Sequence, residues 1–276
     1  MEAIVVPAIG RVMDLRRIGD DEGTFWQNRS LDGRLPSSFG PWLNYGGDKC
    51  WPAPQSDWPR RQVHDWPPAA AFDASSYDAV ASNSSLTMTS PVDPHWGIQA
   101  VRVFEPNPLL PILRIRTTYR KVRGDAVRVA IWTITQLQEP ELLALRMPEN
   151  SIFEAGYVRL LEAEPAGLRT DGRLLSFRRH LREFVKIGSD ASSVLWVGSR
   201  SVVKIEAEAA IGDCPDGGCC VEVYTNPGQL EYVELETLGP LGTLEPGATV
   251  EHTTSYTVLP RTHVDPHAEA KSALDF

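Results

Sequence analysis

Short stretches in which apolar and polar residues alternate recur along the chain after residue 110. Over residues 127–137 the alternation places Val129 and Ile131 on one face of an extended strand, and Trp132 and Gln136 on the other. Such stretches are rich in Val, Ile, Thr, Tyr and Trp and are separated by Gly, Pro, Asp or Asn, a pattern typical of strands joined by turns. The same pattern predicts strands over residues 112–119, 193–198, 201–209, 220–226, 232–239 and 249–259. Many strands with short connections predict an all-β fold, an antiparallel sandwich or barrel.

The other segments predict little helix. Only residues 154–164 and 177–186 have patterns compatible with short helices. Residues 35–97 hold five tryptophans and many prolines with little periodicity, which indicates ordered long loops and short hairpins laid over one end or face of the sheets. We expect a single domain over residues 1–260, followed by a polar, loosely held tail over residues 261–276.

Composition narrows the class of protein. The chain has 276 residues, of which 42% are hydrophobic and 23% charged, values that exclude wholesale disorder. Its net charge is −9, and Lys and Arg form no run longer than two, so we expect no nucleic-acid partner. Apolar stretches stay well short of the roughly 18 residues of a membrane span, and the first residues lack the features of a secretion signal. The expected location is therefore the cytoplasm, with no membrane partner.

The four cysteines are too few for a disulfide scaffold in a chain of this length. Cys219 and Cys220 are adjacent and cannot easily pair with each other, so we expect reduced thiols at these positions and at Cys50 and Cys214. The spacing C-x4-C-C lacks the usual C-x2-C of zinc sites, and we expect no metal and no cofactor.

The densest cluster of candidate chemistry lies in residues 44–55, which read NYGGDKCWPAPQ. Gly46 and Gly47 allow a tight turn or close approach of the backbone to a ligand. Asp48 and Lys49 then lie next to Trp51, and a polar pair beside an indole suits a sugar, whose apolar face stacks on the ring. The alternative is a surface turn with solvated charges and a tryptophan in the core.

The strand predicted at 232–239 carries two glutamates on one face. Glu234 and Glu236 would lie about 6.6 Å apart, with Val233 and Leu235 pointing the other way. If the apolar side meets a second sheet, both carboxylates stand on the open face, where two nearby carboxylates can hold different pKa values and act as acid and base. The alternative is an exposed edge strand with two solvated glutamates.

Other candidates are less specific. Trp132 and Gln136 on one strand face form a sugar-like platform, or else belong to a second hydrophobic layer. Lys186 could reach the same site or lie on the surface. Asp216 belongs to a strong turn sequence, PDGG. The histidines form no catalytic or metal-binding pattern, and only His95, within the tryptophan-rich region, is of interest.

These motifs resemble galactose mutarotase-like proteins. Residues 5–15 resemble the opening hairpin of that fold, and residues 232–259 resemble its closing strands, in which a glutamate-bearing strand is followed by a Leu-x-Pro-Gly turn, here Leu244–Gly247. The resemblance covers most of residues 4–259. The segments between are similar to a bacterial family of unknown function on the same fold, through N-Y-G-G-D-K-x-W-P-A-P-Q, A-I-W-T-I-T-Q, P-D-G-G and Y-T-N-P.

The resemblance implies a β-supersandwich with a sugar site on the concave face of one large sheet. Mutarotases of this fold open and close the sugar ring with a glutamate as base and a histidine as acid. Glu236 stands where the glutamate would be, but Trp132 takes the place of the histidine and cannot transfer a proton at neutral pH. If the protein is an enzyme, another group must supply the acid: Lys49, Lys186, Glu234 or His95.

Three hypotheses follow. The first is an aldose epimerase-like isomerase that acts on a small-molecule carbohydrate, a sugar or sugar derivative, by proton transfer at the anomeric carbon, with Glu236 as catalytic base. A cationic Lys49 or Lys186 could instead meet an acidic sugar, a carboxylate or a phosphate. The second is a non-catalytic carbohydrate-binding module, and the third is a structural or interaction sandwich. The oligomeric state stays open. For the first two hypotheses the expected ligand-binding residues are Asn44, Asp48, Lys49, Trp51, Trp132, Gln136, Lys186 and Glu234.

Overall fold

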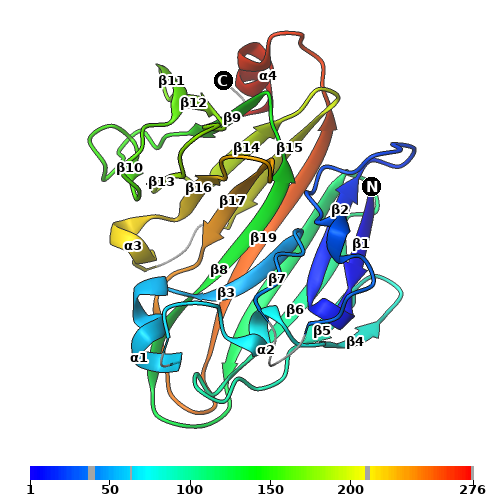
Figure 1. Ribbon diagram of the computed structural model, residues 1–276, viewed down its shortest axis with the longest axis vertical. Coiled ribbons are helices and arrows are strands. Elements are labelled where there is room, and N and C mark those ends of the chain that lie inside the picture. The colour runs from blue at the N-terminus through cyan, green and yellow to red at the C-terminus, as the bar shows by residue number, and fades with distance from the viewer. Residues whose placement is uncertain (37–40, 63, 209–211, 275–276) are drawn as a thin grey trace.

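The computed structural model describes residues 1–36, 41–62, 64–208 and 212–274. Within them the chain forms two antiparallel sheets that face each other (Figure 1). The nine-stranded sheet comprises β1 (Glu2–Val6), β2 (Arg11–Arg16), β3 (Asp48–Ala53), β8 (Val127–Gln138), β17 (Tyr232–Leu238), β16 (Val221–Thr225), β13 (Val185–Ser189) and β10 (Val158–Arg159), in that order, with β18 (Gly242–Leu244) paired to β8. The ten-stranded sheet comprises β11 (Ala166–Asp171), β12 (Leu174–Arg178), β9 (Leu142–Arg146), β14 (Ser193–Val197), β15 (Ser201–Ala207), β19 (Thr249–Pro260), β7 (Ile112–Lys121), β6 (Ile98–Pro106), β5 (Leu86–Thr89) and β4 (Asp78–Ala81). The predicted all-β antiparallel sandwich is confirmed.

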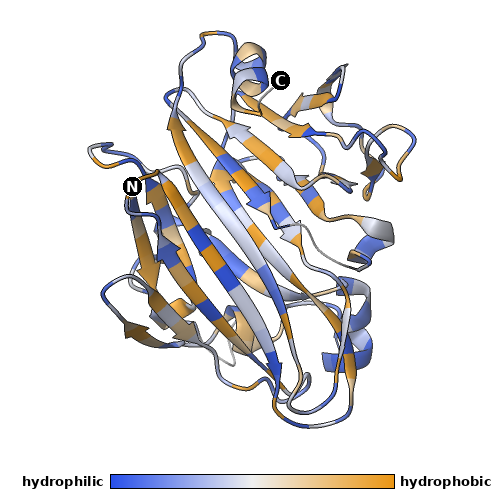
Figure 2. Ribbon diagram, turned by 180° about the vertical axis from the view of Figure 1, so that it is seen from behind, coloured by the Kyte–Doolittle hydropathy of each residue, from blue (hydrophilic) through white to orange (hydrophobic). Residues whose placement is uncertain are grey.

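The main hydrophobic core fills the space between the two sheets. Val233 and Leu235 of β17 contribute to it from the nine-stranded sheet, and Tyr256 and Val258 of β19 from the ten-stranded sheet. Seen from the other side, the strands carry alternating polar and apolar bands, as expected where one face of a sheet is buried and the other is not (Figure 2). Each predicted strand lies within two residues of an observed one over the described residues.

A second hydrophobic core combines tryptophans with residues of β8 and with residues of β6 and β7 in the ten-stranded sheet. The segment after β3 forms η3 (Gln55–Asp57), α1 (Trp58–Gln62) and α2 (Ala70–Asp73), which Figure 1 shows beside β3 at one end of the molecule. Trp51, Trp58 and Trp132 pack there with ring centroids 5.5–6.5 Å apart. The tryptophan-rich region is thus ordered over most of its length. The remaining short elements are η1 (Pro7–Ile9) and η2 (Arg29–Leu31).

Three local predictions were wrong. Residues 154–164 form turns and the short strand β10, and residues 177–186 cover the end of β12, a turn and the start of β13. In both places pairing with neighbouring strands overrides the weak helical pattern. The tail after Pro260 contains the helix α4 (Pro266–Ala273), capped at its start by the Asp265 side chain. This helix buries Ala270 and Leu274 against the core, so it is firmly packed.

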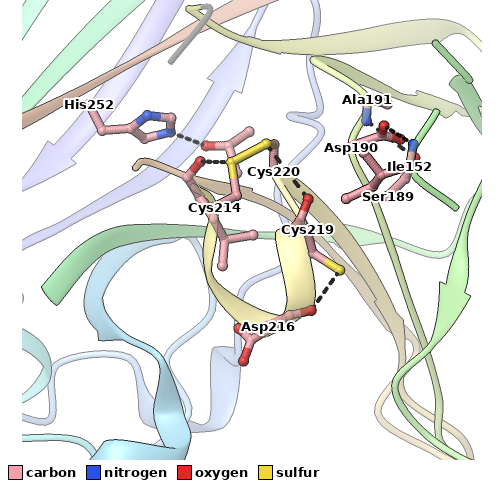
Figure 3. The surroundings of a disulfide bond; sticks show 12 residues. Ile152, Ser189, Asp190, Ala191, Cys214, Asp216, Cys219, Cys220 and His252 are labelled. Carbon is pink, nitrogen blue, oxygen red and sulfur yellow. Dashed lines mark hydrogen bonds between the residues drawn. A yellow bond between two sulfur atoms is a disulfide. The ribbon is translucent and has the colours of Figure 1, made fainter. Parts of the chain in front are cut away.

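The cysteine prediction was also wrong for two residues. Cys214 and Cys220 form a disulfide across the turn α3 (Pro215–Gly218), while Cys50 and Cys219 are free and buried (Figure 3). The PDGG turn, with Asp216 at a φ of 52°, folds the chain back on itself and brings Cys214 next to Cys220. Pairing over six residues depends on this turn geometry, which the adjacency of Cys219 and Cys220 did not reveal.

A buried ion pair joins the two sheets. Asp48 of β3 points into the core, where its carboxylate pairs with Arg102 of β6 and accepts a hydrogen bond of 2.7 Å from the Tyr256 hydroxyl. Both charged side chains are fully buried. An ion pair removed from water in this way stabilises the fold only while both partners are present, because either charge alone would be buried without compensation.

We therefore expect Asp48→Ala to lower the free energy of unfolding by about 3–5 kcal/mol, because it leaves the Arg102 guanidinium buried and unpaired. The matched control is Glu208→Ala, which removes half of the exposed Arg114–Glu208 pair and should cost under about 1 kcal/mol. Urea unfolding of both variants measures the difference. Equal losses in the two variants would contradict a structural role for the buried pair.

Candidate functional site

Polar side chains gather on the outward face of the nine-stranded sheet, where β3, β8, β17, β16 and β13 lie side by side. Because Val233 and Leu235 of β17 point into the core, Glu234 and Glu236 point to the outward face. The strand register then fixes their neighbours. One row across the strands holds Lys49, Ile134, Glu236, Glu222 and Gly188, and the next row holds Gln136, Glu234, Tyr224 and Lys186. We call Lys49, Gln136, Lys186, Glu222, Glu234 and Glu236 the polar cluster.

Lys186 links two carboxylates of the polar cluster. Its Nζ lies 2.6 Å from Glu222 Oε2 and 3.0 Å from Glu236 Oε2. Burial acts to lower the pKa of Lys186, but the attraction of the two carboxylates outweighs it, so the pKa is raised. Lys186 therefore stays charged and is a poor proton donor.

Glu236 is held from two sides. The Trp132 indole donates a hydrogen bond of 2.6 Å to Glu236 Oε2, the same oxygen that Lys186 contacts, and the Lys186 ammonium lies 4.5 Å from the centre of the Trp132 ring. Burial raises the pKa of Glu236 to about 7, opposed by Lys186 and reinforced by the adjacent Glu222 carboxylate. Glu222 lies directly opposite Glu236 on the neighbouring strand, and Lys186 contacts both carboxylates.

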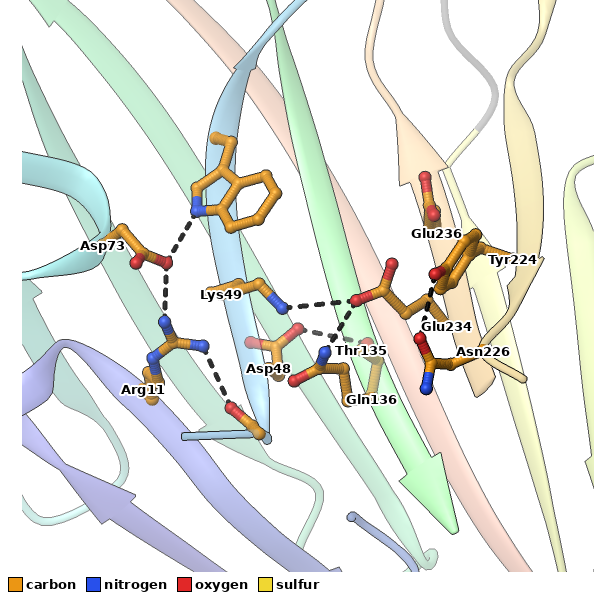
Figure 4. A network of polar contacts seen from close by, with 12 residues as sticks. Arg11, Asp48, Lys49, Asp73, Thr135, Gln136, Tyr224, Asn226, Glu234 and Glu236 are labelled. Atoms are coloured by element: carbon orange, nitrogen blue, oxygen red, sulfur yellow. Dashed lines mark hydrogen bonds and ion pairs between the residues drawn. The ribbon is translucent and has the colours of Figure 1, made fainter. Parts of the chain in front are cut away.

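Lys49 belongs to β3, which pairs with the edge of β8 opposite β17, and its side chain is fully buried. Its nearest carboxylate oxygen, Glu234 Oε1, is 3.8 Å away and also accepts a hydrogen bond of 2.8 Å from Gln136 (Figure 4). Lys49 Nζ lies 4.9 Å from the centre of the Trp51 ring and has no hydrogen-bond partner among the described residues. Burial lowers the pKa of Lys49 to about 8, although Glu234 partly offsets the effect.

The polar cluster thus contains a carboxyl group and an ammonium group that both titrate close to neutral pH. Lys49 and Glu236 are separated on the sheet only by Ile134 of β8, so their Cα atoms lie two strand spacings, roughly 10 Å, apart. A small ring bound over Ile134 would face the carboxyl group on one side and the ammonium on the other. Such a pair can exchange protons with a ligand, because general acid and base groups work best when their pKa values lie near the working pH.

Most of the residues predicted from the sequence meet at this place. Lys49, Trp51, Trp132, Gln136, Lys186, Glu234 and Glu236 all lie on the outward face, and β17 lies inside the sheet rather than at an edge. Asp48 does not belong to the group, because it points into the core toward Arg102. Consecutive residues of a strand point to opposite faces, so Asp48 and Lys49 cannot share a site once both lie in β3.

Two further predicted residues lie at or beyond the margin. Asn44 is next to Tyr232, whose pKa is raised by burial and partly lowered again by hydrogen bonds from Asn44 and Gln136. Asn44 therefore borders the polar cluster. His95 is exposed in the turn before β6 of the other sheet, and it donates its backbone N–H to Asp93 rather than reaching the cluster.

Sequence reasoning missed Glu222 and Tyr224. The signal was present, since residues 220–226 were predicted as a strand and Glu222 and Tyr224 share the face opposite Val221 and Val223. Their importance depends on β16 pairing with β17, which brings Glu222 opposite Glu236. Asp216 of the PDGG turn also lies within hydrogen-bonding reach of Glu222.

The described residues contain no group of three or more His, Cys, Asp or Glu side chains able to hold a metal ion. No helix in the described part of the chain is long and apolar enough to cross a membrane.

Comparison with solved structures identifies the fold. A galactose mutarotase-like protein from Lactobacillus casei superposes with a TM-score of 0.63 at 10% identity, covering 93% of this chain and 96% of that chain. A mutarotase candidate from Salmonella typhimurium gives a TM-score of 0.55 at 9% identity, covering 92% and 86%. An aldose 1-epimerase candidate from Escherichia coli K12 gives 0.53 at 11% identity, covering 92% and 94%. No protein-family model matches the sequence, and no curated protein does. The chain is an all-β protein with the galactose mutarotase-like fold, as the sequence resemblance implied.

The raised pKa of Glu236 predicts how stability changes with pH. Because the folded chain binds the Glu236 proton more tightly than the unfolded chain does, the contribution of Glu236 to stability is present below pH 4.5 and is lost as the pH rises to about 7. The free energy of unfolding of the wild type, minus that of Glu236→Gln, should fall by about 3 kcal/mol over this range. Denaturant unfolding at pH 4.5 and pH 7 measures it.

The control for this measurement is Glu149→Gln, which alters an exposed glutamate. Its difference from the wild type should stay constant over the same range. A Glu236→Gln difference that is constant, or that rises with pH, would show that the Glu236 carboxyl group is not destabilised by its surroundings.

Proposed function

We propose that this chain is a carbohydrate-active protein, an aldose epimerase-like isomerase that interconverts the anomers of a neutral sugar. The observation that carries the proposal is the pairing, across Ile134, of a buried carboxyl group with a pKa of about 7 and a buried ammonium with a pKa of about 8 that has no hydrogen-bond partner among the described residues. The structural neighbours support a carbohydrate-related fold. They show no specific activity at this level of identity, so the activity is argued from the site.

In the proposed reaction Glu236 accepts the proton of the hydroxyl group on C1, and Lys49 donates a proton to the ring oxygen. The bond between C1 and the ring oxygen breaks, and the electrons of the former O–H bond form the carbonyl group of the open-chain aldehyde. Rotation about the bond between C1 and C2, followed by the reverse proton transfers, closes the other anomer. Lys49 thus supplies the acid that Trp132 cannot, and Trp132 orients Glu236 instead.

Charge balance favours a neutral sugar. The polar cluster contains three carboxyl groups and two ammonium groups, so its net charge is −1 when Glu236 is ionised and able to act as the base. A sugar bearing a carboxylate or phosphate would add a further negative charge next to Glu234, and the nearest cation, Lys49, already lies 3.8 Å from that carboxylate. The Lys186 ammonium is already matched by two carboxylates.

A second candidate is a non-catalytic carbohydrate-binding protein. The observation in its favour is that Trp132 occupies the position of the usual acid, while Lys49 and Glu236 are both fully buried in this structure. Such a protein would bind the sugar without changing the rate at which its anomers interconvert.

Polarimetry separates the two candidates. The wild type should accelerate the mutarotation of at least one of glucose, galactose, mannose and xylose, and Glu236→Gln should lower that rate at least 100-fold because the base is lost. Binding of the same sugar, followed by NMR titration, should change less than threefold, and Glu149→Gln should leave both quantities unchanged. Binding without acceleration by the wild type would establish the second candidate, and no binding of any sugar would refute both.

The two pKa values also predict a pH profile. The quantity kcat/KM should rise as Glu236 ionises around pH 7 and fall as Lys49 loses its proton around pH 8, giving a narrow bell. Lys49→Arg keeps a positive charge that does not titrate in this range but gives up its proton poorly, so kcat/KM should fall at every pH, and the remaining activity should lack the falling limb while the rising limb stays in place. Initial rates from pH 5 to pH 10 test this, and a falling limb that persists in Lys49→Arg would exclude Lys49 as the acid.

A further inference from the structure

A cavity of about 940 Å³ lies next to the polar cluster and plays no part in the proposed reaction. Its walls are formed by the β1–β2 hairpin, the loop over residues 21–35, the end of β8 and the turn at residues 229–231. A volume of this size is within the range of small-molecule sites.

The lining of this cavity has the chemistry of a carbohydrate site. Trp26 provides a half-buried indole, and amide side chains can both donate and accept hydrogen bonds with hydroxyl groups. Six carboxylates and three arginines among the described lining residues make the cavity net negative, which disfavours anionic ligands. The amides are those of Gln27, Asn28, Gln138 and Gln229.

Trp26 connects the cavity to the polar cluster. Its backbone N–H donates a hydrogen bond of 2.9 Å to the carbonyl oxygen of Gln136, so it continues the row of the sheet that holds Gln136 and Glu234. Its ring lies 4.7 Å from that of Tyr232, which borders the cluster. Gln138, which lines the cavity, stands on the same face of β8 as Gln136, about 6.8 Å further along the strand.

The partly exposed residues of the polar cluster lie in the row of the sheet that Trp26 continues. Lys49, Glu222 and Glu236 expose at most 1% of their surface, whereas the side chains of Glu234 and Lys186 are 15% and 18% exposed. Both of these partly exposed residues belong to the row that Trp26 continues. A ligand that reaches the cluster past Glu234 therefore has its outer end next to Trp26.

From this arrangement we infer that the cavity beside Trp26 is a second sugar subsite, and that the preferred ligand is a neutral di- or oligosaccharide whose reducing-end unit lies in the polar cluster and whose next unit stacks on Trp26. This inference rests on the proposed carbohydrate function and adds the substrate class. The net negative charge of the cavity, and that of the polar cluster when Glu236 is ionised, both favour uncharged sugar units.

The experiment compares monosaccharides with disaccharides by isothermal titration calorimetry. Glucose is measured against maltose, cellobiose and gentiobiose, and galactose against β-1,4-galactobiose. In the wild type at least one disaccharide should bind at least tenfold more tightly than its monosaccharide. Trp26→Ala should abolish this preference while leaving the monosaccharide dissociation constant within twofold, and Trp26→Tyr should restore most of it because a ring remains for stacking.

Two variants keep the test decisive. Gln138→Ala alters the cavity from a different strand and should weaken only the disaccharide, so it replaces Trp26→Ala if that variant does not fold. Leu109→Ala, at a side chain 91% exposed and absent from the cavity wall, is the matched control and should change nothing.

The failures of the two proposals are distinguishable. Equal binding of monosaccharides and disaccharides by the wild type, or a disaccharide preference that survives both Trp26→Ala and Gln138→Ala, overturns the second subsite and leaves the proposed function intact. No binding of either kind of sugar overturns the proposed function, and the second subsite with it.

Discussion

The register in which β17 pairs with β8 and β16 is the constraint on which the rest of the structure depends. Val233 and Leu235 are needed in the core between the sheets, and a shift of one residue would place glutamates there instead. The large cost of burying a charged group fixes the register. The same register lines up Glu236 with Glu222 on the outward face and brings both within reach of Lys186.

The polar cluster carries a penalty that the rest of the fold must offset. Charged groups removed from water are stabilised only in part by their partners. The raised pKa of Glu236 and the lowered pKa of Lys49 show that burial disfavours the charged form of each group more than its partners favour it. Two hydrophobic cores provide the compensation, one between the sheets and one that joins the tryptophans to residues of both sheets. A protein whose only task was to be stable would gain by replacing such a cluster with apolar side chains.

Much of the fold could be predicted from the sequence, because alternation of apolar and polar residues reports directly on which strand face is buried. That is why the strands were found, and why Glu234 and Glu236 were placed on the face of β17 that points away from the core between the sheets, although Glu236 is fully buried there rather than open to solvent. The failures all required knowledge of which segments meet. The Cys214–Cys220 disulfide depends on the shape of one turn, and Glu222 gains its importance only from the strand beside it.

The site was predicted less completely than the fold. Asp48 was assigned to the site from its position next to Lys49, although alternation within β3 sends it to the opposite side. The helix α4 was missed because its apolar residues are few, and their burial depends on a surface offered by β9 and β14. Tertiary partners, which a single sequence does not reveal, decide both cases.

The opposed directions of Asp48 and Lys49 have a consequence for altering this protein. Two adjacent positions of β3 carry separate tasks, since one ties the sheets together and the other faces the polar cluster. The same division holds along β16 and β17, where every second residue belongs to the core between the sheets. A combinatorial library confined to the outward positions of β16 and β17 would therefore vary the charge of the polar cluster while leaving the packing between the sheets unchanged.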